Sequence, residues 1–413
     1  RYQGLQIQNL NAEIANIANK QAAVQLKAVI LGPINEMMDY LRPTPVLLQR
    51  PLLANQLKLS GTGKLDLAFT LPLQNTDDLK LNAALFLSNN TVQWSDLAPF
   101  NKVQGTVRLT EELPQFEQIS AEFFGGTVSL KQNVGSQNKK GLYDLSGKVN
   151  LTRLKDHFSN KVGDESRQLL NALNGNVGFK GNLALSNNLT DLNLDLDLNA
   201  LGSNLPQPLD KKIGSNLTGQ FKYQSVLNDS TSNRSSQWTA QIGKNISLQG
   251  RLNAQGVMSQ GIGIDASPLM PDSGIGINLQ ANDLNVDDWH SLLYPKIVNS
   301  KTSPQKLITE IPKGETNTNG LNTFNAQVRN AVALNRQWPN LTLNAKLVNG
   351  IWQIQAKSPR LEGQVQYIDR PGFDLVKGKL SRLNIPESSS KVFGAGGKPE
   401  TQATPKTVPL NSI

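Results

Sequence analysis

The residue types that could perform chemistry are few in this chain and lie far apart in the sequence. His157 and His290 are the only histidines, and neither has a serine or carboxylate arranged nearby as in a catalytic triad or metal site. His290 follows Asp287 and Asp288, so a metal is conceivable there, but acidic residues at a helix start explain this segment better. We therefore expect no catalytic residue and no enzymatic activity.

Two further patterns resemble binding motifs. Asp191, Asp195 and Asp197 share one face of a predicted strand and could in principle bind Ca²⁺. A solvated strand face, whose charges discourage aggregation, explains them better. The glycine-containing stretches 261–263 and 274–276 lie inside alternating strand patterns rather than between a strand and a helix, so they do not predict a phosphate-binding loop. The sequence predicts no metal site and no cofactor.

The composition limits the classes of partner. The 413 residues carry a net charge of +9, with 38% hydrophobic and 6% aromatic residues. This charge suits either an anionic partner, such as nucleic acid or a phospholipid surface, or a mildly basic surface without a partner. Because no cluster of Lys and Arg has aromatic residues between them, we expect no nucleic-acid site.

The absence of cysteine and the hydropathy of the sequence further limit the class of protein. Without Cys the chain has no disulfide, thiolate metal site or Cys nucleophile, which is compatible with a bacterial envelope protein. No stretch approaches the roughly 18 to 20 apolar residues of a membrane-spanning helix, and the sequence begins at Arg1 without a signal peptide. We expect this sequence to be part of a longer protein.

Apolar residues alternate with polar ones along much of the chain, and this alternation predicts the strands that would position any site. The alternation is sharpest at residues 192–198, where Leu alternates with Asn and Asp, and residues 65–73 are another case. Since successive side chains of a strand point to opposite faces, the pattern predicts a mainly β fold with a long antiparallel sheet that is apolar on one face.

Glycines recur on the predicted apolar face, two residues before an apolar residue, as at Gly63, Gly105 and Gly147. A glycine removes a side chain where a sheet must bend, so the recurrence indicates a sheet that curves consistently. Within a strand predicted over residues 116–130, residues 123–126 (Phe-Phe-Gly-Gly) switch the phase of the alternation. We predict a β-bulge at this point.

The pattern divides the chain into five sections. Residues 1–45 are predicted to be a helical segment, because apolar residues recur at helical spacing over residues 11–41 until Gly32-Pro33 interrupts them. The remaining sections are a β section (46–155), a polar connection with a short helix (156–176), a second β section with a short helix near 287–293 and a polar loop at 299–320 (177–385), and a disordered linker or tail (386–413). The short helices are expected to cover edges of the sheet.

We predict that the apolar positions of these strands share one face and line whatever that face covers. The predicted lining residues are Leu65, Leu67, Phe69, Leu71, Leu79, Leu81, Leu85, Leu87, Val107, Leu109, Val128, Leu130, Leu145, Val149, Leu151, Val177, Phe179, Leu183, Leu192, Leu194, Leu196, Leu198, Phe221, Leu248, Leu252, Ile277, Leu279, Leu341, Leu343, Ile354 and Val365.

Several short motifs together resemble the large AsmA-like envelope proteins of Gram-negative bacteria. They are residues 41–45 (Leu-Arg-Pro-Thr-Pro), 61–65 (Gly-Thr-Gly-Lys-Leu) with 71–73 (Leu-Pro-Leu), 103–105 (Val-Gln-Gly) and 124–126 (Phe-Gly-Gly). The YhdP branch is resembled most by residues 192–198 leading to 204–209 (Asn-Leu-Pro-Gln-Pro-Leu) and Lys211, and by residues 284–289 (Leu-Asn-Val-Asp-Asp-Trp). The resemblance covers about residues 40–385.

The resemblance implies a periplasmic β structure rolled into an open, taco-like groove, in a protein anchored in the inner membrane by an N-terminal helix that this sequence lacks. It further implies that the groove shields acyl chains while phospholipids move between the inner and outer membranes. Phospholipids would be the ligand, with outer-membrane or periplasmic proteins as further partners. The residue pattern agrees, since a Leu ladder poor in aromatic residues could line a slot for hydrocarbon, and each buried methylene contributes about 0.8 kcal/mol.

Three other classes of protein remain open from the residues alone. A structural scaffold or adhesin whose apolar face packs on itself has the same alternation, because any half-buried antiparallel sheet shows it. An outer-membrane barrel is disfavoured because the aromatic girdles of such barrels are missing. An enzyme is disfavoured because no convergent acid, base or nucleophile is visible.

Overall fold

A computed structural model describes residues 4–15, 22–42, 57–75, 78–94, 98–110, 115–133, 141–160, 164–186, 189–227, 234–253, 255–293, 320–370 and 373–385. The described strands belong to one open, mixed sheet of 22 strands, accompanied by a few short helices. The chain divides into two compact units: unit 1 is Arg1–Lys161, Gly175–Ala200 and Lys222–Val226, and unit 2 is Val162–Asn174, Leu201–Phe221 and Leu227–Ile413. The predicted mainly β fold class is confirmed.

The elements that lie wholly or largely in unit 1 are β1 (Gln6–Ala15), β2 (Ala23–Pro33), α1 (Ile34–Leu41), β3 (Leu57–Ser60), β4 (Thr62–Pro72), β5 (Lys80–Trp94), β6 (Phe100–Leu109), β7 (Gln115–Phe123), β8 (Gly126–Gln132), β9 (Leu142–Asn150), α4 (Leu151–Phe158), β10 (Leu173–Leu185) and β11 (Leu189–Asp197). Those of unit 2 are α5 (Asp164–Ala172), β12 (Leu201–Ser203), β14 (Arg234–Ile242), β15 (Ile246–Leu252), β16 (Met258–Ile264), β17 (Gly274–Asn285), α6 (Val286–Leu293), β18 (Leu321–Ala333), β19 (Arg336–Val348), β20 (Ile351–Lys357), β21 (Leu361–Arg370) and β22 (Phe373–Leu383). Strand β13 (Thr218–Leu227) has residues in both units.

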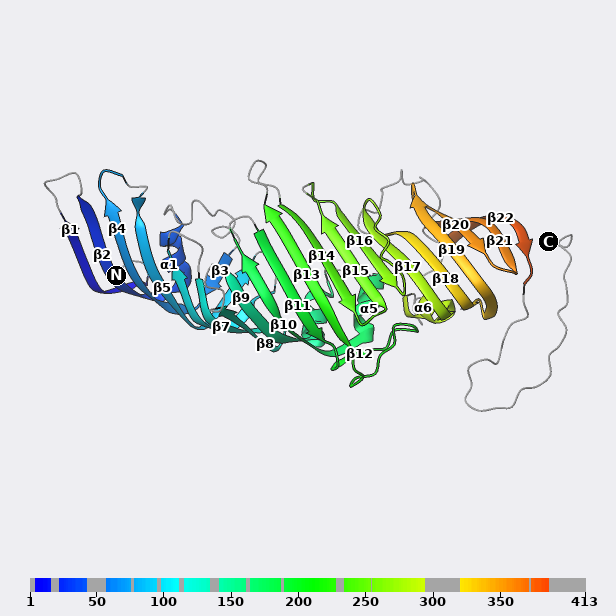
Figure 1. Ribbon diagram of the computed structural model, residues 1–413, viewed down its shortest axis with the longest axis horizontal. Coiled ribbons are helices and arrows are strands. Elements are labelled where there is room, and N and C mark those ends of the chain that lie inside the picture. Colours follow the sequence, from blue (N-terminus) through cyan, green and yellow to red (C-terminus); the bar gives the residue numbers. More distant parts are fainter. Residues whose placement is uncertain are drawn as a thin grey trace, which may run out of the picture. The chain divides into compact units, whose positions relative to one another are not determined.

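Each strand of unit 1 pairs antiparallel with a strand that lies close to it in the sequence. Paired neighbours follow the order β1, β2, β4, β5, β6, β7, β8, β9, β10 and β11, and β3 pairs with the C-terminal part of β5 (Figure 1). The antiparallel pairing that the alternation predicts is confirmed in this unit.

No described residue before Ile34 is helical, so the predicted helical segment over residues 1–45 is wrong for the part that the structure describes before α1. β1 and β2 form an antiparallel pair, with Ile14 opposite Val24 and Ile7 opposite Ile30. β2 then pairs with β4. The residues of β2 alternate with a period of two, and pairing with a strand on each side favours the extended conformation over the helix that the apolar spacing predicts. Among the described residues of this section, only α1 is a helix.

The segment predicted as one bulged strand over residues 116–130 is two strands, β7 and β8, joined by a tight turn. Phe124 and Gly125 form the turn, and both have positive φ angles, of 45° and 73°. Two consecutive residues with positive φ make the two-residue hairpin turn that matches the twist of antiparallel strands. The change of phase at Phe123-Phe124 therefore marks a chain reversal and not a bulge.

Unit 2 contains two parallel pairs, which corrects the prediction of a wholly antiparallel sheet. β14, β15 and β16 pair antiparallel, but β16 with β17 and β17 with β18 are parallel. β18 to β22 then return to antiparallel pairing. Side-chain alternation is the same in parallel and antiparallel strands, so the sequence pattern could not distinguish them.

The connection from β16 to β17 crosses the polar face of these two strands, and the strand glycines make room for it. A Cβ on Gly261 would lie 2.9 Å from the Leu269 carbonyl oxygen, and one on Gly276 would overlap the same oxygen. The hydroxyl of Ser259 donates to the Pro271 carbonyl at 2.5 Å, and Asn278 donates to the Ser267 carbonyl at 2.9 Å. The glycines in stretches 261–263 and 274–276 thus leave space for the backbone of the connection that crosses these strands.

The helices follow strands and lie at one end of them. In unit 1, α1 follows β2 and α4 follows β9, and the register places the C-terminal ends of β2 and β9 at the same end of the sheet, the helical end. In unit 2, α6 follows β17 and contacts α5. Short helices lie where the sequence predicts them, within residues 156–176 and near 287–293, and these are α5 and α6. Residues 299–319 and 386–413 lie outside the described residues. Within the described part of the chain, no helix is long and apolar enough to cross a membrane.

Candidate functional site

The apolar face of unit 1 is continuous in register from strand to strand. Ile30 of β2 lies opposite Leu65 of β4, which lies opposite Leu85 of β5, which in turn lies opposite Val107 of β6. Further along the unit, Leu130 of β8 lies opposite Leu145 of β9. Alternation within strands and registry between them together bring the apolar residues onto one face.

The same face continues through β9, β10 and β11. Gly147, Phe179 and Leu196 occupy one cross-strand row, and Leu145, Gly181 and Leu194 occupy another. A third row contains Tyr143, Leu183 and Leu192. Asn and charged residues occupy the alternate positions, so the opposite face of these strands is polar.

Unit 2 has an equivalent apolar face. Ile262 of β16 lies beside Ile277 of β17, which lies beside Phe324 of β18. Leu343 of β19 lies opposite Ala356 of β20, and Ile354 lies opposite Val365 of β21. The apolar face continues across parallel and antiparallel pairs alike. In both kinds of pair, residues that lie opposite each other point their side chains to the same side of the sheet.

The structure places most of the predicted lining residues at these inward positions. Leu79, Leu151 and Leu198 lie outside the named strands, in a turn, at the first position of α4 and just after β11. Phe221 stacks with Trp238, with ring centroids 6.4 Å apart. The buried members are Leu65, Leu81, Leu85, Leu87, Val128, Leu151, Leu198, Leu279 and Leu341, and all the others are half-buried.

This distribution of exposure distinguishes the face from the interior of a two-layer protein. A residue in a closed core contacts side chains on every side and is fully buried. Here Leu67, Leu145 and Leu194 keep part of their surface accessible although they belong to apolar rows. Full burial is concentrated in two clusters, one around Leu85 in unit 1 and one around Leu341 in unit 2.

Helix α1 covers the helical end of the apolar face in unit 1. Ile34 is fully buried, its N–H donates to the Gly61 carbonyl at 3.0 Å, and its Cγ2 lies where a Cβ on Gly63 would approach to 2.6 Å. Met37, 3% exposed, packs in the same cluster as Leu65. Sequence reasoning missed Ile34 and Met37 as lining residues. The Pro33 that precedes the helix was an available signal, because Pro favours helix starts.

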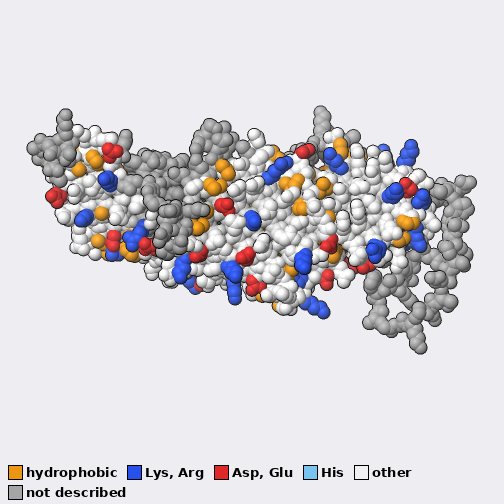
Figure 2. Space-filling view, in the orientation of Figure 1, with side chains coloured by type: hydrophobic (Ala, Val, Ile, Leu, Met, Phe, Trp, Pro, Cys, Tyr) orange, Lys and Arg blue, Asp and Glu red, His pale blue; other side chains and the backbone are white. Residues whose placement is uncertain are grey.

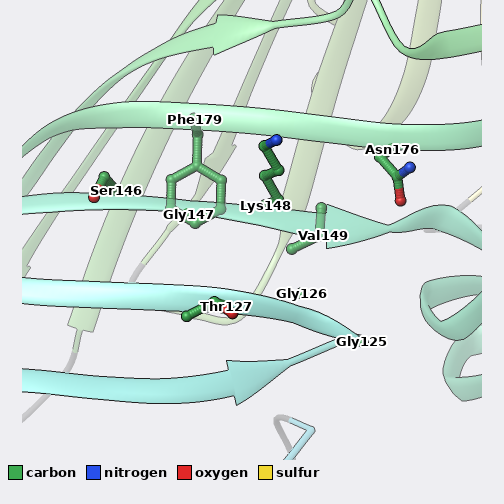
Figure 3. A pocket seen from close by; sticks show the side chains of 9 residues that line it. All are labelled: Gly125, Gly126, Thr127, Ser146, Gly147, Lys148, Val149, Asn176 and Phe179. Carbon is green, nitrogen blue, oxygen red and sulfur yellow. The ribbon is translucent and has the colours of Figure 1, made fainter.

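A hollow opens on the sheet between β8, β9 and β10, close to α4. It has a volume of about 500 Å³ and is lined by Gly125, Gly126, Thr127, Ser146, Gly147, Lys148, Val149, Asn176 and Phe179. In Figure 3 the ring of Phe179 extends from β10 across Gly147 of β9, and a Cβ on Gly147 would lie 2.8 Å from the ring. The glycine therefore accommodates the flat aromatic ring of the neighbouring strand.

One polar side chain, Asn90, is fully buried at an inward position of β5, opposite Val103. Its amide nitrogen donates to the carbonyls of Thr62 (2.8 Å) and Ser60 (3.4 Å), and its oxygen accepts from the backbone N–H of Ser88 (2.7 Å). These bonds join β5 to the break between β3 and β4. Asn90 thus satisfies backbone groups where the strands change register.

Helix α6 is fixed to unit 2 by three side chains. Asn285 caps the helix by accepting from the N–H groups of Asp287 and Asp288. The two carboxylate oxygens of Asp287 accept from the N–H groups of Leu334 and Asn335, each at 2.7 Å. The Trp289 indole donates to the Gln207 carbonyl at 3.0 Å. The 284–289 motif therefore anchors the helix to a turn and to the segment 204–209.

The residues considered for chemistry have structural partners. His157 packs edge-on against Phe124 and Phe158. Asp191 accepts from the Asn193 side chain, and Asp197 accepts from the backbone of Asn199. Among the described residues, no group of three or more His, Cys, Asp or Glu side chains could hold a metal ion. The arrangement described here is an extended apolar surface.

Comparison with known proteins identifies the family. The family model described as YhdP protein matches residues 1–410. No curated protein matches the chain, and no solved structure matches it.

Proposed function

The chain belongs to the YhdP family of bacterial envelope proteins, and from this premise we propose that it is a section of a periplasmic lipid-transfer bridge. Its apolar sheet face would carry the acyl chains of phospholipids between the inner and outer membranes. The full-length protein would be anchored in the inner membrane by a helix, with periplasmic or outer-membrane proteins as further partners. We propose that it binds no nucleic acid and catalyses no reaction.

The observation that carries this proposal is the continuous, half-buried apolar face. Rows such as Leu145, Gly181 and Leu194 pass from strand to strand without a charged residue. A surface of this kind is costly to leave in water, because apolar area exposed to water contributes about 25 cal/mol per Å² when it is covered. Hydrocarbon chains would cover it.

The dimensions of the face suit an acyl chain. Val177 and Leu183 are six residues apart on β10, or about 20 Å at about 3.4 Å per residue. The hydrocarbon of one bilayer leaflet is about 15 Å thick, half of the roughly 30 Å core. An acyl chain can therefore lie along one strand, with each covered methylene contributing about 0.8 kcal/mol.

An open face also explains how a headgroup could remain hydrated. The polar positions of the strands project to the other side of the sheet, so a lipid on the apolar face would contact mainly hydrocarbon. The headgroup would then stay in water at the strand ends, which avoids the cost of burying an unpaired charge. Such a surface recognises the lipid class through its chains and needs no single indispensable residue.

Native mass spectrometry of the purified chain, followed by lipid extraction, tests the proposal. The protein is expressed in bacterial cells and isolated without detergent, and we expect several phospholipids to remain bound to each chain. A folded β-rich protein without bound lipid would favour the alternative, a structural scaffold whose apolar face is closed, and would overturn the conduit.

A further inference from the structure

The outward face of the last four strands of unit 2 is strongly basic. The registers place Lys346, Gln353, Gln366 and Lys377 in one row across β19 to β22, and Asn344, Gln355, Gln364 and Lys379 in the next. A third row contains Thr342, Lys357, Glu362 and Arg382. We name Lys346, Lys357, Lys377, Lys379 and Arg382 the basic face.

The charge of this face is not balanced by the residues around it. The three rows contain five cationic side chains and one carboxylate, that of Glu362, which pairs with Arg382 at 3.4 Å. All five cationic residues are exposed. In Figure 2, Lys and Arg side chains gather over the part of unit 2 where Figure 1 places β20 to β22, with little acidic surface among them.

A basic face of this kind is not a general property of the polar side of the sheet. On β9 to β11, the outward rows are Lys148, Gly178 and Asp197; Ser146, Lys180 and Asp195; and Asp144, Asn182 and Asn193. These rows contain two cationic and three anionic side chains. Like charges on a solvated strand face are normally interspersed with opposite ones, so segregation at β19 to β22 points to an anionic partner.

The other side of the same edge strand exposes apolar residues. Val376 is 63% exposed, Leu380 39% and Leu383 37%, and they lie opposite Tyr367, Gly363 and Leu361 of β21. β22 is thus amphipathic, with Lys377, Lys379 and Arg382 on one face and exposed aliphatic side chains on the other. An edge strand with cations on one face and exposed aliphatic side chains on the other carries both kinds of side chain that bind at the boundary between headgroups and hydrocarbon.

From these observations we infer that the basic face and β22 form a docking surface for an anionic phospholipid bilayer. A bilayer fits better than nucleic acid, because the outward positions of the three rows contain no aromatic side chain on which a base could stack. The attraction is electrostatic and acts at the surface, so it is separate from the binding of acyl chains on the apolar face.

Co-sedimentation of the full 413-residue chain with vesicles tests this inference. Vesicles of phosphatidylcholine with one third phosphatidylglycerol are compared with vesicles of phosphatidylcholine alone, at low and high salt. Each basic residue near an anionic surface contributes about fivefold to binding, from about 1 kcal/mol per residue. The double variant Lys377→Gln, Lys379→Gln should therefore bind the anionic vesicles about 25-fold more weakly, and added salt should reduce the difference.

A matched variant controls for net charge. Lys131→Gln with Lys180→Gln removes two exposed lysines from the polar face of unit 1 and should change vesicle binding less than twofold. An equal loss in both variants, or equal binding of the unaltered chain to both vesicles, would overturn the docking surface. So would binding to a duplex oligonucleotide that is tighter than vesicle binding and lost in the Lys377 and Lys379 variant. The number of lipids retained in native mass spectra is unaffected by these outcomes and tests the conduit alone.

Discussion

Leu194→Asp places a carboxylate in an apolar row of unit 1, and its effect depends on whether the face is open. Leu194 is half-buried and lies opposite Gly181 of β10. In an open groove the new carboxylate keeps contact with water. The protein then loses only part of the roughly 1.5 to 3 kcal/mol that full burial of a Leu side chain contributes to stability. We expect the free energy of unfolding to fall by about 1 kcal/mol.

The same substitution should affect lipid binding more strongly. An acyl chain that must avoid a carboxylate loses contact over about three methylenes, which at about 0.8 kcal/mol each amounts to about 2.4 kcal/mol. This corresponds to about a 60-fold weaker affinity at this position. Native mass spectrometry should show fewer bound phospholipids, while urea denaturation shows an almost unchanged midpoint.

Two matched variants make the comparison decisive. Leu65→Asp introduces the same carboxylate at a residue that is 3% exposed, where the loss of a buried Leu and an unpaired buried charge together cost more than about 5 kcal/mol. Asn82→Asp adds the charge on the exposed polar face of β5, in the same unit, and should change neither measurement. If Leu194→Asp unfolds the protein as Leu65→Asp does, the face is a packed core. If Leu194→Asp folds and retains all its lipid, the face does not carry acyl chains.

Four further substitutions test the fold around the site. Asp287→Ala removes the acceptor of two backbone N–H groups in the β18–β19 turn and should destabilise the protein by about 1 to 3 kcal/mol, with faster hydrogen exchange confined to that turn. Gly276→Ala should destabilise by more than about 2 kcal/mol in urea, because its Cβ overlaps the crossing backbone, whereas Gly378→Ala, with its nearest neighbour at 3.8 Å, should change stability by less than about 1 kcal/mol. Burial raises the pKa of Tyr143, so stability is retained below the ordinary tyrosine pKa of about 10 and lost as the pH rises above it; Tyr143→Phe should remove that alkaline loss in denaturation at pH 9 and pH 11.

The alternation of side chains is sufficient to predict the strands and the apolar face, because both follow from local geometry. Leu65, Leu145 and Leu343 all lie on that face. The parallel pairs of β17 are not predictable in this way, since they depend on which strand edge the chain returns to. α1 and its residue Ile34 were obscured by an N-terminal section whose Ala and Ile spacing suits a helix and a strand equally.

The positions of the glycines can be read from the sequence, but the reason for each glycine cannot. The recurrence of Gly147 and its equivalents was visible, and a bend was a reasonable explanation. Their neighbours supply another reason, because Phe179 covers Gly147 and Trp238 covers Gly250. The side chain that covers a given glycine depends on the register between the two strands and on that side chain's rotamer. The residues of a single strand determine neither of these.

Pairing between strands that are close in the sequence has a consequence for how the chain acquires its structure. Contacts of low sequence separation form quickly, since little loop entropy is lost before each one is made. In unit 1 every new hairpin can add to the edge left by the previous one, as in repeat proteins whose stability is a sum of nearest-neighbour terms. A polypeptide delivered from one end could therefore assemble progressively, and insertion or loss of a hairpin during evolution would alter its length without redesigning the remainder.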